Sequence, residues 1–277
     1  MRCLTHHGVH VLLCLAVIAP ACTDEANNPF EEPDAWTSDG DEWDGGSRED
    51  AGDEGDGDTG WPERDLDPTC RGLLELEGED LRQALRDMVI GHDSLSYDSA
   101  REEMFAGVDN HDGRVQCVYT GEWVTTDGIP PTSVMNTEHT WCQSWGADVL
   151  PAKSDLNHLY PALSDVNIRR SNNLFGEVVQ PVWESGGSVL GRDEIGRTVF
   201  EPRDQHKGDC ARAMFYFAVR YNMEITYASM ENALRSWNRR DLPDEKEMER
   251  NDAIELIQSK RNPFIDCPEA VDKIPDF

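Results

Sequence analysis

Residues 136–176 read NTEHTWCQSWGADVLPAKSDLNHLYPALSDVNIRRSNNLFG and gather imidazole, carboxylate and amide groups without a cysteine pair at zinc spacing. Glu138 and His139 are sequence neighbours, so they point to opposite faces of a strand but converge at a strand end or bend. Residues 166–172 lack strand alternation and indicate a short helix carrying Asn167. Carboxylate and amide oxygens suit Mg²⁺, Mn²⁺ or Ca²⁺. A histidine that is not a ligand is free to act as a base.

Each of these residues also has an ordinary structural interpretation. A Glu-His pair is common on surfaces and at caps, and His158, between two leucines, fits a buried structural histidine. Arg169 and Arg170 fit a solvated helix face, and Asn172 fits a turn or a helix end. Spacing alone therefore does not choose between a metal site and a structural segment.

Several segments, in one order, resemble the bacterial endonuclease I family. They are LRQALRDMVIGHDSLSYD, CVYTGEW, NTEHTWCQSW, PAKSDLNHLYP, VNIRRSNNLFGEV, KGDCARAMFYFAVRYN and WNRRDLPDEKEMERNDAIELIQSKRNPFID, which together span roughly residues 70–267. The resemblance implies an α+β fold, rich in helices, with a small antiparallel sheet and a ββα-metal (His-Me finger) motif. It also implies a secreted or periplasmic, metal-dependent endonuclease. Such an enzyme hydrolyses DNA, or RNA, with little sequence specificity.

The resemblance also implies roles for individual residues. His139 becomes the general base, while Glu138 and Asn167 hold one Mg²⁺, with Mn²⁺ or Ca²⁺ as alternatives. Arg170 matches an arginine that contacts the phosphate, and a structural salt bridge is the equally open alternative. The remaining expected residues are Arg169 and Asn172 for substrate binding, and Asp155, Asn157 and His158 as supporting groups.

Three departures from the family pattern affect these roles. Cys142 stands where many relatives have proline, which changes the turn after His139. Asn157 stands where relatives often have histidine, so the orientation of the site differs. Some members carry a catalytic arginine in a longer loop, but only 13 residues separate His139 from Lys153 and none is arginine. That role is either absent or taken by Arg170.

The N-terminal residues 1–22, MRCLTHHGVHVLLCLAVIAPAC, predict an export signal. The apolar run over residues 9–19 is too short to span a bilayer and is typical of a secretory leader. The imperfect lipobox IAPAC favours lipidation at Cys22, with ordinary cleavage after Ala21 as the alternative. We therefore expect an exported protein, either a lipoprotein of the outer surface or periplasm, or a secreted one. Its membrane contact would be through Cys22 alone.

Residues 23–68 are acidic and poor in aliphatic side chains, which predicts a disordered tether before one catalytic domain, residues 69–277. We expect that domain to be a monomer.

The chain carries a net charge of −30; residues 1–68 hold 18 acidic and 3 basic side chains, or −15, and the rest supplies the other −15. A nucleic-acid binder normally shows a basic footprint. The charge therefore favours weak, cation-dependent binding and keeps open a degenerate family member that binds a cation or a partner without catalysis. A surface lipoprotein unrelated to nucleases is a further alternative.

Periodicity predicts helices over residues 80–90, 209–221, 228–237 and 244–260, and short strands within residues 115–126 and 180–198. The strands of residues 115–126 should pair beside the strand that carries Glu138. Export favours disulfides among the five cysteines of the mature domain. Cys70 and Cys267 bracket the domain, Cys117 and Cys142 fall on neighbouring predicted strands, and Cys210 would remain a buried thiol. The sequence does not fix this connectivity.

Overall fold

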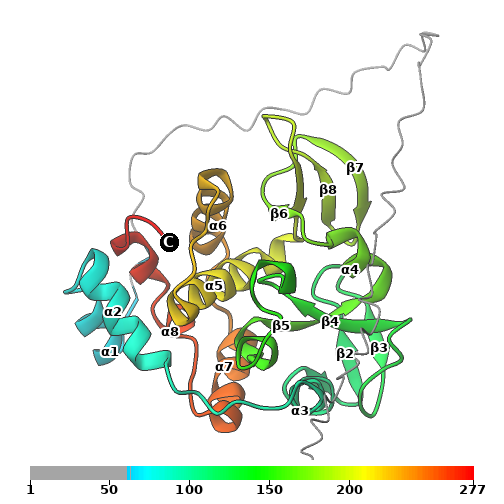
Figure 1. The fold of residues 1–277 in the computed structure, drawn as a ribbon, viewed down its shortest axis with the longest axis horizontal. Coiled ribbons are helices and arrows are strands. Elements are labelled where there is room, and N and C mark those ends of the chain that lie inside the picture. The colour runs from blue at the N-terminus through cyan, green and yellow to red at the C-terminus, as the bar shows by residue number, and fades with distance from the viewer. Residues whose placement is uncertain (1–60, 63) are drawn as a thin grey trace, which may run out of the picture. The chain divides into compact units, whose positions relative to one another are not determined.

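The computed structural model describes residues 61–62 and 64–277, which form an α+β fold in which most helices gather around α5 and short sheets lie to one side (Figure 1). The predicted leader, Cys22 and most of the predicted tether lie outside the described residues. Within the described part of the chain, every helix is too short or too polar to cross a membrane. The helices are α1 (Pro68–Leu73), α2 (Gly78–Val89), α3 (Tyr97–Glu103), α4 (Ser164–Arg170), α5 (Asp204–Tyr221), α6 (Ala228–Arg240), α7 (Glu245–Gln258) and α8 (Pro263–Asp266).

The strands form three separate sheets in the described residues. The first is the antiparallel sheet β1 (Asn110–His111), β2 (Arg114–Gln116) and β3 (Trp123–Thr125). The second is the hairpin of β4 (Met135–His139) and β5 (Leu159–Leu163). The third has the order β6 (Leu174–Phe175), β9 (Thr198–Glu201), β8 (Ser188–Arg192) and β7 (Gln180–Ser185), in which β6 and β9 are parallel.

The predicted strands of residues 115–126 exist, but their predicted pairing beside β4 is wrong. β2 and β3 pair with each other and with β1, whereas β4 pairs with β5. The β2–β3 turn meets the second hairpin through the Val118 amide, which donates to the Pro161 carbonyl over 3.0 Å. The first sheet therefore adjoins the hairpin at β5 and not at β4.

Helix α5 forms the centre of the core, and α2, α6 and α8 pack around it (Figure 1). Its Cys210, Met214 and Phe217 are buried, as the helical spacing predicts. The predicted start at Asp209 is wrong, because the helix begins at Asp204. Gly208 explains the error: a Cβ there would lie 2.0 Å from the Asp241 carbonyl oxygen, so this glycine permits close packing inside a helix instead of ending one.

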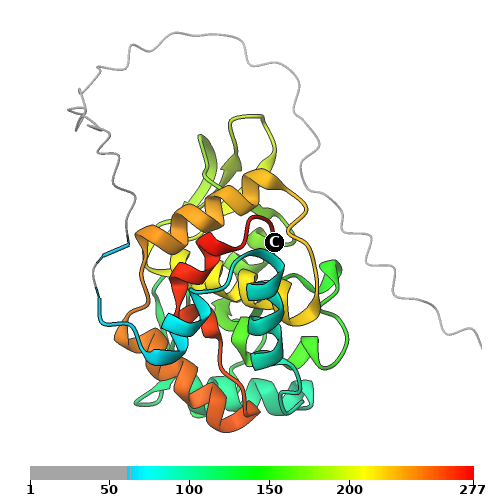
Figure 2. The same cartoon turned by 90° about the vertical axis from the view of Figure 1, so that its left-hand side faces the viewer.

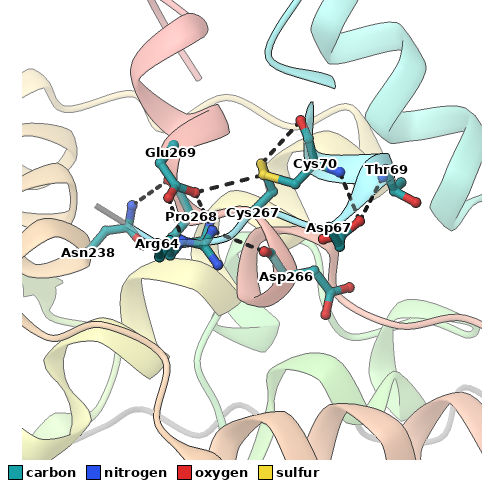
Figure 3. Close-up of a disulfide and its surroundings, with 9 residues drawn as sticks. All are labelled: Arg64, Asp67, Thr69, Cys70, Asn238, Asp266, Cys267, Pro268 and Glu269. Atoms are coloured by element: carbon teal, nitrogen blue, oxygen red, sulfur yellow. Dashed lines mark hydrogen bonds and ion pairs between the residues drawn. A yellow bond between two sulfur atoms is a disulfide. The ribbon is translucent and has the colours of Figure 1, made fainter. Parts of the chain in front are cut away.

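The disulfide between Cys70 and Cys267 is present, as predicted, and joins residues 197 positions apart (Figure 3). The expectation that Cys117 and Cys142 lie on neighbouring strands is wrong, and both are free, buried thiols. Cys117 lies just after β2, where its sulfur accepts the Leu163 amide at 3.3 Å, and Cys142 follows β4. The two strands are not neighbours, so the thiols do not meet. Cys210 is a buried free thiol, as expected.

Residues just before the predicted domain boundary at 68 already contact the C-terminal segment. The Trp61 indole donates to Asp272 over 2.8 Å, and the Arg64 Nε donates to Glu269 over 2.6 Å. Figure 3 shows Arg64 and Glu269 beside the disulfide, and in Figure 2 the N-terminal helices lie next to the C-terminal segment. Ordered contacts of the domain thus begin before the position at which the composition changes.

Candidate active site

The consecutive elements β4, β5 and α4 form the frame of the candidate site. Alternation along β4 places Asn136 and Glu138 on one face and Thr137 and His139 on the other. Helix α4 lies against the first of these faces. The Asn167 amide nitrogen donates to Asn136 Oδ1 over 2.6 Å and to the Thr137 carbonyl over 3.3 Å. Its amide oxygen therefore remains available as an acceptor.

Glu138 is buried in a polar cluster between β4 and α4. Its Oε1 accepts the Tyr119 hydroxyl at 2.9 Å and lies 3.4 Å from the Arg170 Nε. The other oxygen, Oε2, has no hydrogen-bond partner among residues 61–62 and 64–277. Burial raises the pKa of Glu138 to about 7, although the Arg170 charge and the Tyr119 hydroxyl both favour the carboxylate. A cation beside Oε2 would favour ionisation further.

Arg170 holds the frame together from inside. Its guanidinium donates to the carbonyls of Ser171, Asn173 and Thr140 over 3.2, 2.7 and 3.1 Å, and stacks 4.0 Å from the centre of the Phe175 ring. The side chain is completely buried. In this conformation the guanidinium forms the ion pair of the salt-bridge alternative, and the phosphate contact stays a prediction. The ion pair places Arg170 beside the Glu138 carboxylate.

His139 occupies the last residue pair of the β4–β5 hairpin, opposite Leu159. Its Nε2 lies 3.1 Å from the Lys153 carbonyl oxygen. A carbonyl only accepts, so Nε2 carries the hydrogen and Nδ1 is the unprotonated acceptor. The Gln143 amide nitrogen donates to Nδ1 over 3.4 Å. Burial, with a smaller contribution from His158, lowers the pKa of His139 to about 3, so the ring is neutral at physiological pH.

The two neighbours Glu138 and His139 thus have separate surroundings. Glu138 contacts Tyr119 and α4, whereas His139 lies 5.6 Å from Tyr97, measured between ring centroids. Within the described residues no hydrogen bond or ion pair joins them. The structure brings Glu138 and Asn167 to the α4 side of the strand and places His139 on the other side, at the strand end.

The supporting residues fix the loop that contacts His139. Asp155 is fully buried and accepts the Tyr216 and Tyr221 hydroxyls of α5 at 2.9 and 2.8 Å. It also accepts the backbone and side-chain nitrogens of Asn157, both at 3.1 Å. His158 is fully buried, with Nε2 2.7 Å from the Ala152 carbonyl oxygen, and corresponds to the structural alternative. These contacts hold the segment whose Lys153 carbonyl fixes the imidazole.

The remaining predicted residues are exposed. Arg169 stacks over the Trp183 ring at 5.1 Å, and the Asn172 amide lies 3.5 Å from the Ser144 hydroxyl. Sequence reasoning missed Tyr119, which bonds Glu138 from outside the central stretch. Its only sequence signal was its place in the family-like segment CVYTGEW.

One group of three His, Cys, Asp or Glu ligand atoms within 4.8 Å occurs in the described part of the chain, formed by Cys70, Cys267 and Glu269. Two of its members form the disulfide, so it is not a metal site. A site at Glu138 would instead be a mixed carboxylate and amide site.

Comparison with known proteins assigns the chain to a family. Residues 77–269 match the Endonuclease I family model, and the chain belongs to the Endonuclease I family. It is 32% identical over 237 residues to an extracellular ribonuclease of Bacillus subtilis (strain 168), which covers 77% of this chain and 80% of the relative. An extracellular ribonuclease of Bacillus amyloliquefaciens is 31% identical with the same coverage. An extracellular deoxyribonuclease of Aeromonas hydrophila is 30% identical over 114 residues, or 41% of this chain and 50% of the relative.

Proposed function

We propose that this protein is an exported, metal-dependent endonuclease that hydrolyses phosphodiester bonds of nucleic acid. The observation that carries the proposal is the hydrogen bond between His139 and the Lys153 carbonyl, which leaves Nδ1 unprotonated at the end of the strand that also carries Glu138. Family membership supports it, since the relatives are extracellular ribonucleases and deoxyribonucleases. In this proposal β4, β5 and α4 form the ββα-metal motif.

The donor atoms around β4 fit one hard cation. Glu138 Oε2 and the Asn167 amide oxygen are both oxygen ligands without hydrogen-bond partners among the described residues. Such a donor set suits Mg²⁺, with Mn²⁺ or Ca²⁺ as alternatives, and leaves coordination positions for water and phosphate. When bound, the cation supplies stabilisation of negative charge on the phosphate and on the leaving oxygen.

The protein's own residues perform the remaining tasks. His139 accepts a proton from the attacking water at Nδ1, and the Lys153 carbonyl stabilises the ring once it is charged. Arg170 keeps Glu138 in place through their ion pair. Arg169 and Asn172, exposed at the end of α4, are the candidates for substrate binding.

The proposed substrates are both RNA and DNA. The match covers 80% of the length of each of the two ribonuclease relatives. It covers 50% of the length of the deoxyribonuclease relative. This pattern supports including RNA as a substrate beside the DNA that the sequence suggested. We further propose export as a monomer that reaches a membrane through a lipid on Cys22 alone.

Incubation of the mature protein with supercoiled plasmid and with end-labelled RNA tests the proposal. Cleavage of either substrate with Mg²⁺, and none with EDTA, is the expected result, and His139→Ala serves as the control for a contaminating nuclease. A protein that binds Mg²⁺ but cleaves neither substrate would instead be the degenerate, cation-binding family member.

A further inference from the structure

The outer face of the first sheet carries an exposed aromatic ring between an arginine and a histidine. The register of β1, β2 and β3 puts His111, Arg114, Gln116 and Trp123 on one side, while Val115 is buried on the other. Trp123 is 44% exposed. The Arg114 guanidinium lies 5.2 Å from the centre of its ring, and the His111 ring lies 5.9 Å from it, edge to face.

A cavity of about 250 Å³ adjoins this face, lined in part by His111 and Gln116. Two further cations line it, Arg203 just before α5 and Lys246 in the first turn of α7. The Lys246 ammonium donates to the Gln116 side-chain oxygen over 3.2 Å, which connects the cavity to the sheet. We call the surface formed by His111, Arg114, Gln116, Trp123, Arg203 and Lys246 the sheet face.

The turn between β2 and β3 leaves room for the Arg203 guanidinium at this cavity. Gly121 in that turn has φ +76°, and a Cβ there would lie 2.5 Å from the Arg203 Nη1. The left-handed conformation favours glycine at this position. The Arg203 Nε donates to the Gln205 side-chain oxygen over 2.9 Å. Its two terminal nitrogens have no hydrogen-bond partner in the described residues.

The cations of the sheet face are not neutralised by the protein. Arg114, Arg203 and Lys246 have no carboxylate within 4.0 Å among residues 61–62 and 64–277, so they form no ion pair there. Four acids also line the cavity, and three of them have basic partners within the fold: Asp109 pairs with Arg250 at 2.9 Å, Glu247 bonds Arg212 at 2.8 Å, and Asp209 lies 3.3 Å from Arg212. The fourth, Asp244, accepts the Glu247 amide at 2.8 Å as the N-cap of α7. In so acidic a chain, this grouping gives the surface a local affinity for anions.

We propose that the sheet face binds a segment of single-stranded nucleic acid beside the active site. A base stacks on Trp123, and Arg114, Arg203 and Lys246 contact the phosphates, because an aromatic platform flanked by cations is the arrangement that holds single strands. The bases of a duplex are already stacked on each other, so a duplex binds this face less well. The proposal rests on the proposed nuclease function, for which it supplies a substrate-holding surface separate from Glu138 and His139.

Fluorescence anisotropy with a labelled 12-nucleotide single strand, in EDTA, tests the proposal without cleavage. Trp123→Ala should weaken binding at least about 5-fold, as expected from loss of one base stack, while Trp123→Phe should retain most of the affinity. Lys246→Gln should reduce the slope of log affinity against log salt by about 0.7, one phosphate contact. Lys260→Gln, beyond the other end of α7, is the matched control and should leave the slope unchanged.

The outcomes separate this proposal from the nuclease function. Unchanged single-strand affinity in Trp123→Ala and Lys246→Gln, each checked for native thermal unfolding, would overturn the sheet face while leaving cleavage intact. Equal affinity for a duplex and for the single strand would also overturn it. If the variants bind the single strand more weakly but the native protein cleaves neither substrate, the sheet face binds single strands and the proposed nuclease function is wrong.

Discussion

At the residue scale, two neighbours on β4 have different tasks because their surroundings differ. Glu138 keeps one carboxylate oxygen free, and His139 keeps Nδ1 unprotonated by donating Nε2–H to the Lys153 carbonyl. Burial favours the neutral imidazole, which is the form a general base needs. In the proposed function the pair therefore supplies a ligand and a base from adjacent positions.

These tasks predict opposite responses to metal. His139→Ala should lower the cleavage rate at least about 100-fold, the contribution typical of one proton-transfer group, and added Mg²⁺ should not restore it. Glu138→Ala removes a ligand, so excess Mg²⁺ should restore part of the rate. Mg²⁺ titration of plasmid cleavage by each variant measures both effects. Rescue of His139→Ala but not of Glu138→Ala would show that the two roles are reversed.

At the element scale, Asp155 attaches the loop of Lys153 to helix α5 through two tyrosine hydroxyls. Asp155→Ala would leave both hydroxyls and the Asn157 amide without their buried acceptor. We expect a loss of roughly 3 kcal/mol in the free energy of unfolding, and about 1 kcal/mol for Tyr221→Phe, which removes one bond. Urea unfolding measures these values.

Activity well below the unfolding temperature then tests whether Asp155 positions the site. If the loop holds His139, the rate of Asp155→Ala should fall while its Mg²⁺ dependence stays that of the native protein. If the variant is destabilised but keeps the native cleavage rate, Asp155 stabilises the fold without positioning His139.

The elements also show what the sequence could predict. The stripe of Leu81, Leu85 and Val89 correctly predicted α2, because helical periodicity is a local signal. The partner of β4 was missed, because strand pairing depends on contacts between distant segments, and the expected neighbouring positions of Cys117 and Cys142 followed from it. The start of α5 was placed at Asp209 as a capping residue, whereas the helix begins at Asp204 and continues through Gly208.

The candidate site followed the same division. Glu138, His139 and Asn167 could be proposed from the sequence because they lie in motifs within one short stretch. The burial of Arg170 and the Tyr119 bond to Glu138 were not visible, because they depend on packing across the fold.

At the scale of the whole molecule, buried histidines predict loss of stability in mild acid. Burial lowers the pKa of His158 and of His92 below the ordinary value of 6.5, outweighing the opposite effect of Asp155. In the unfolded chain both imidazoles bind protons near pH ~6.5, whereas in the native state they stay neutral at that pH. The free energy of unfolding should therefore decrease as the pH falls below about 6.5.

Urea unfolding between pH 7.5 and 4.5 checks this expectation. His158→Gln keeps a donor for the Ala152 carbonyl but does not titrate, so its stability should depend less steeply on pH. Constant stability of the native protein down to pH 5 would contradict the account.

The ends of the domain are joined twice, by the disulfide and by polar contacts beside it. The bond between Cys70 and Cys267 spans 197 positions, so it removes much conformational freedom from the unfolded chain. Replacing both cysteines with serine should lower the free energy of unfolding by about 2–5 kcal/mol. Arg64 should keep the ends together in this variant, because its Nε still donates to Glu269.

Differential scanning calorimetry of the native protein, the double serine variant and the same variant with Arg64→Gln measures each contribution. We expect the serine variant to unfold in one transition at a lower temperature, and Arg64→Gln to lower it by a further few degrees at most, since a partly exposed ion pair contributes about 1 kcal/mol or less. A serine variant with the native unfolding temperature would mean that packing of α1 and α8, and not the covalent bond, holds the two ends together.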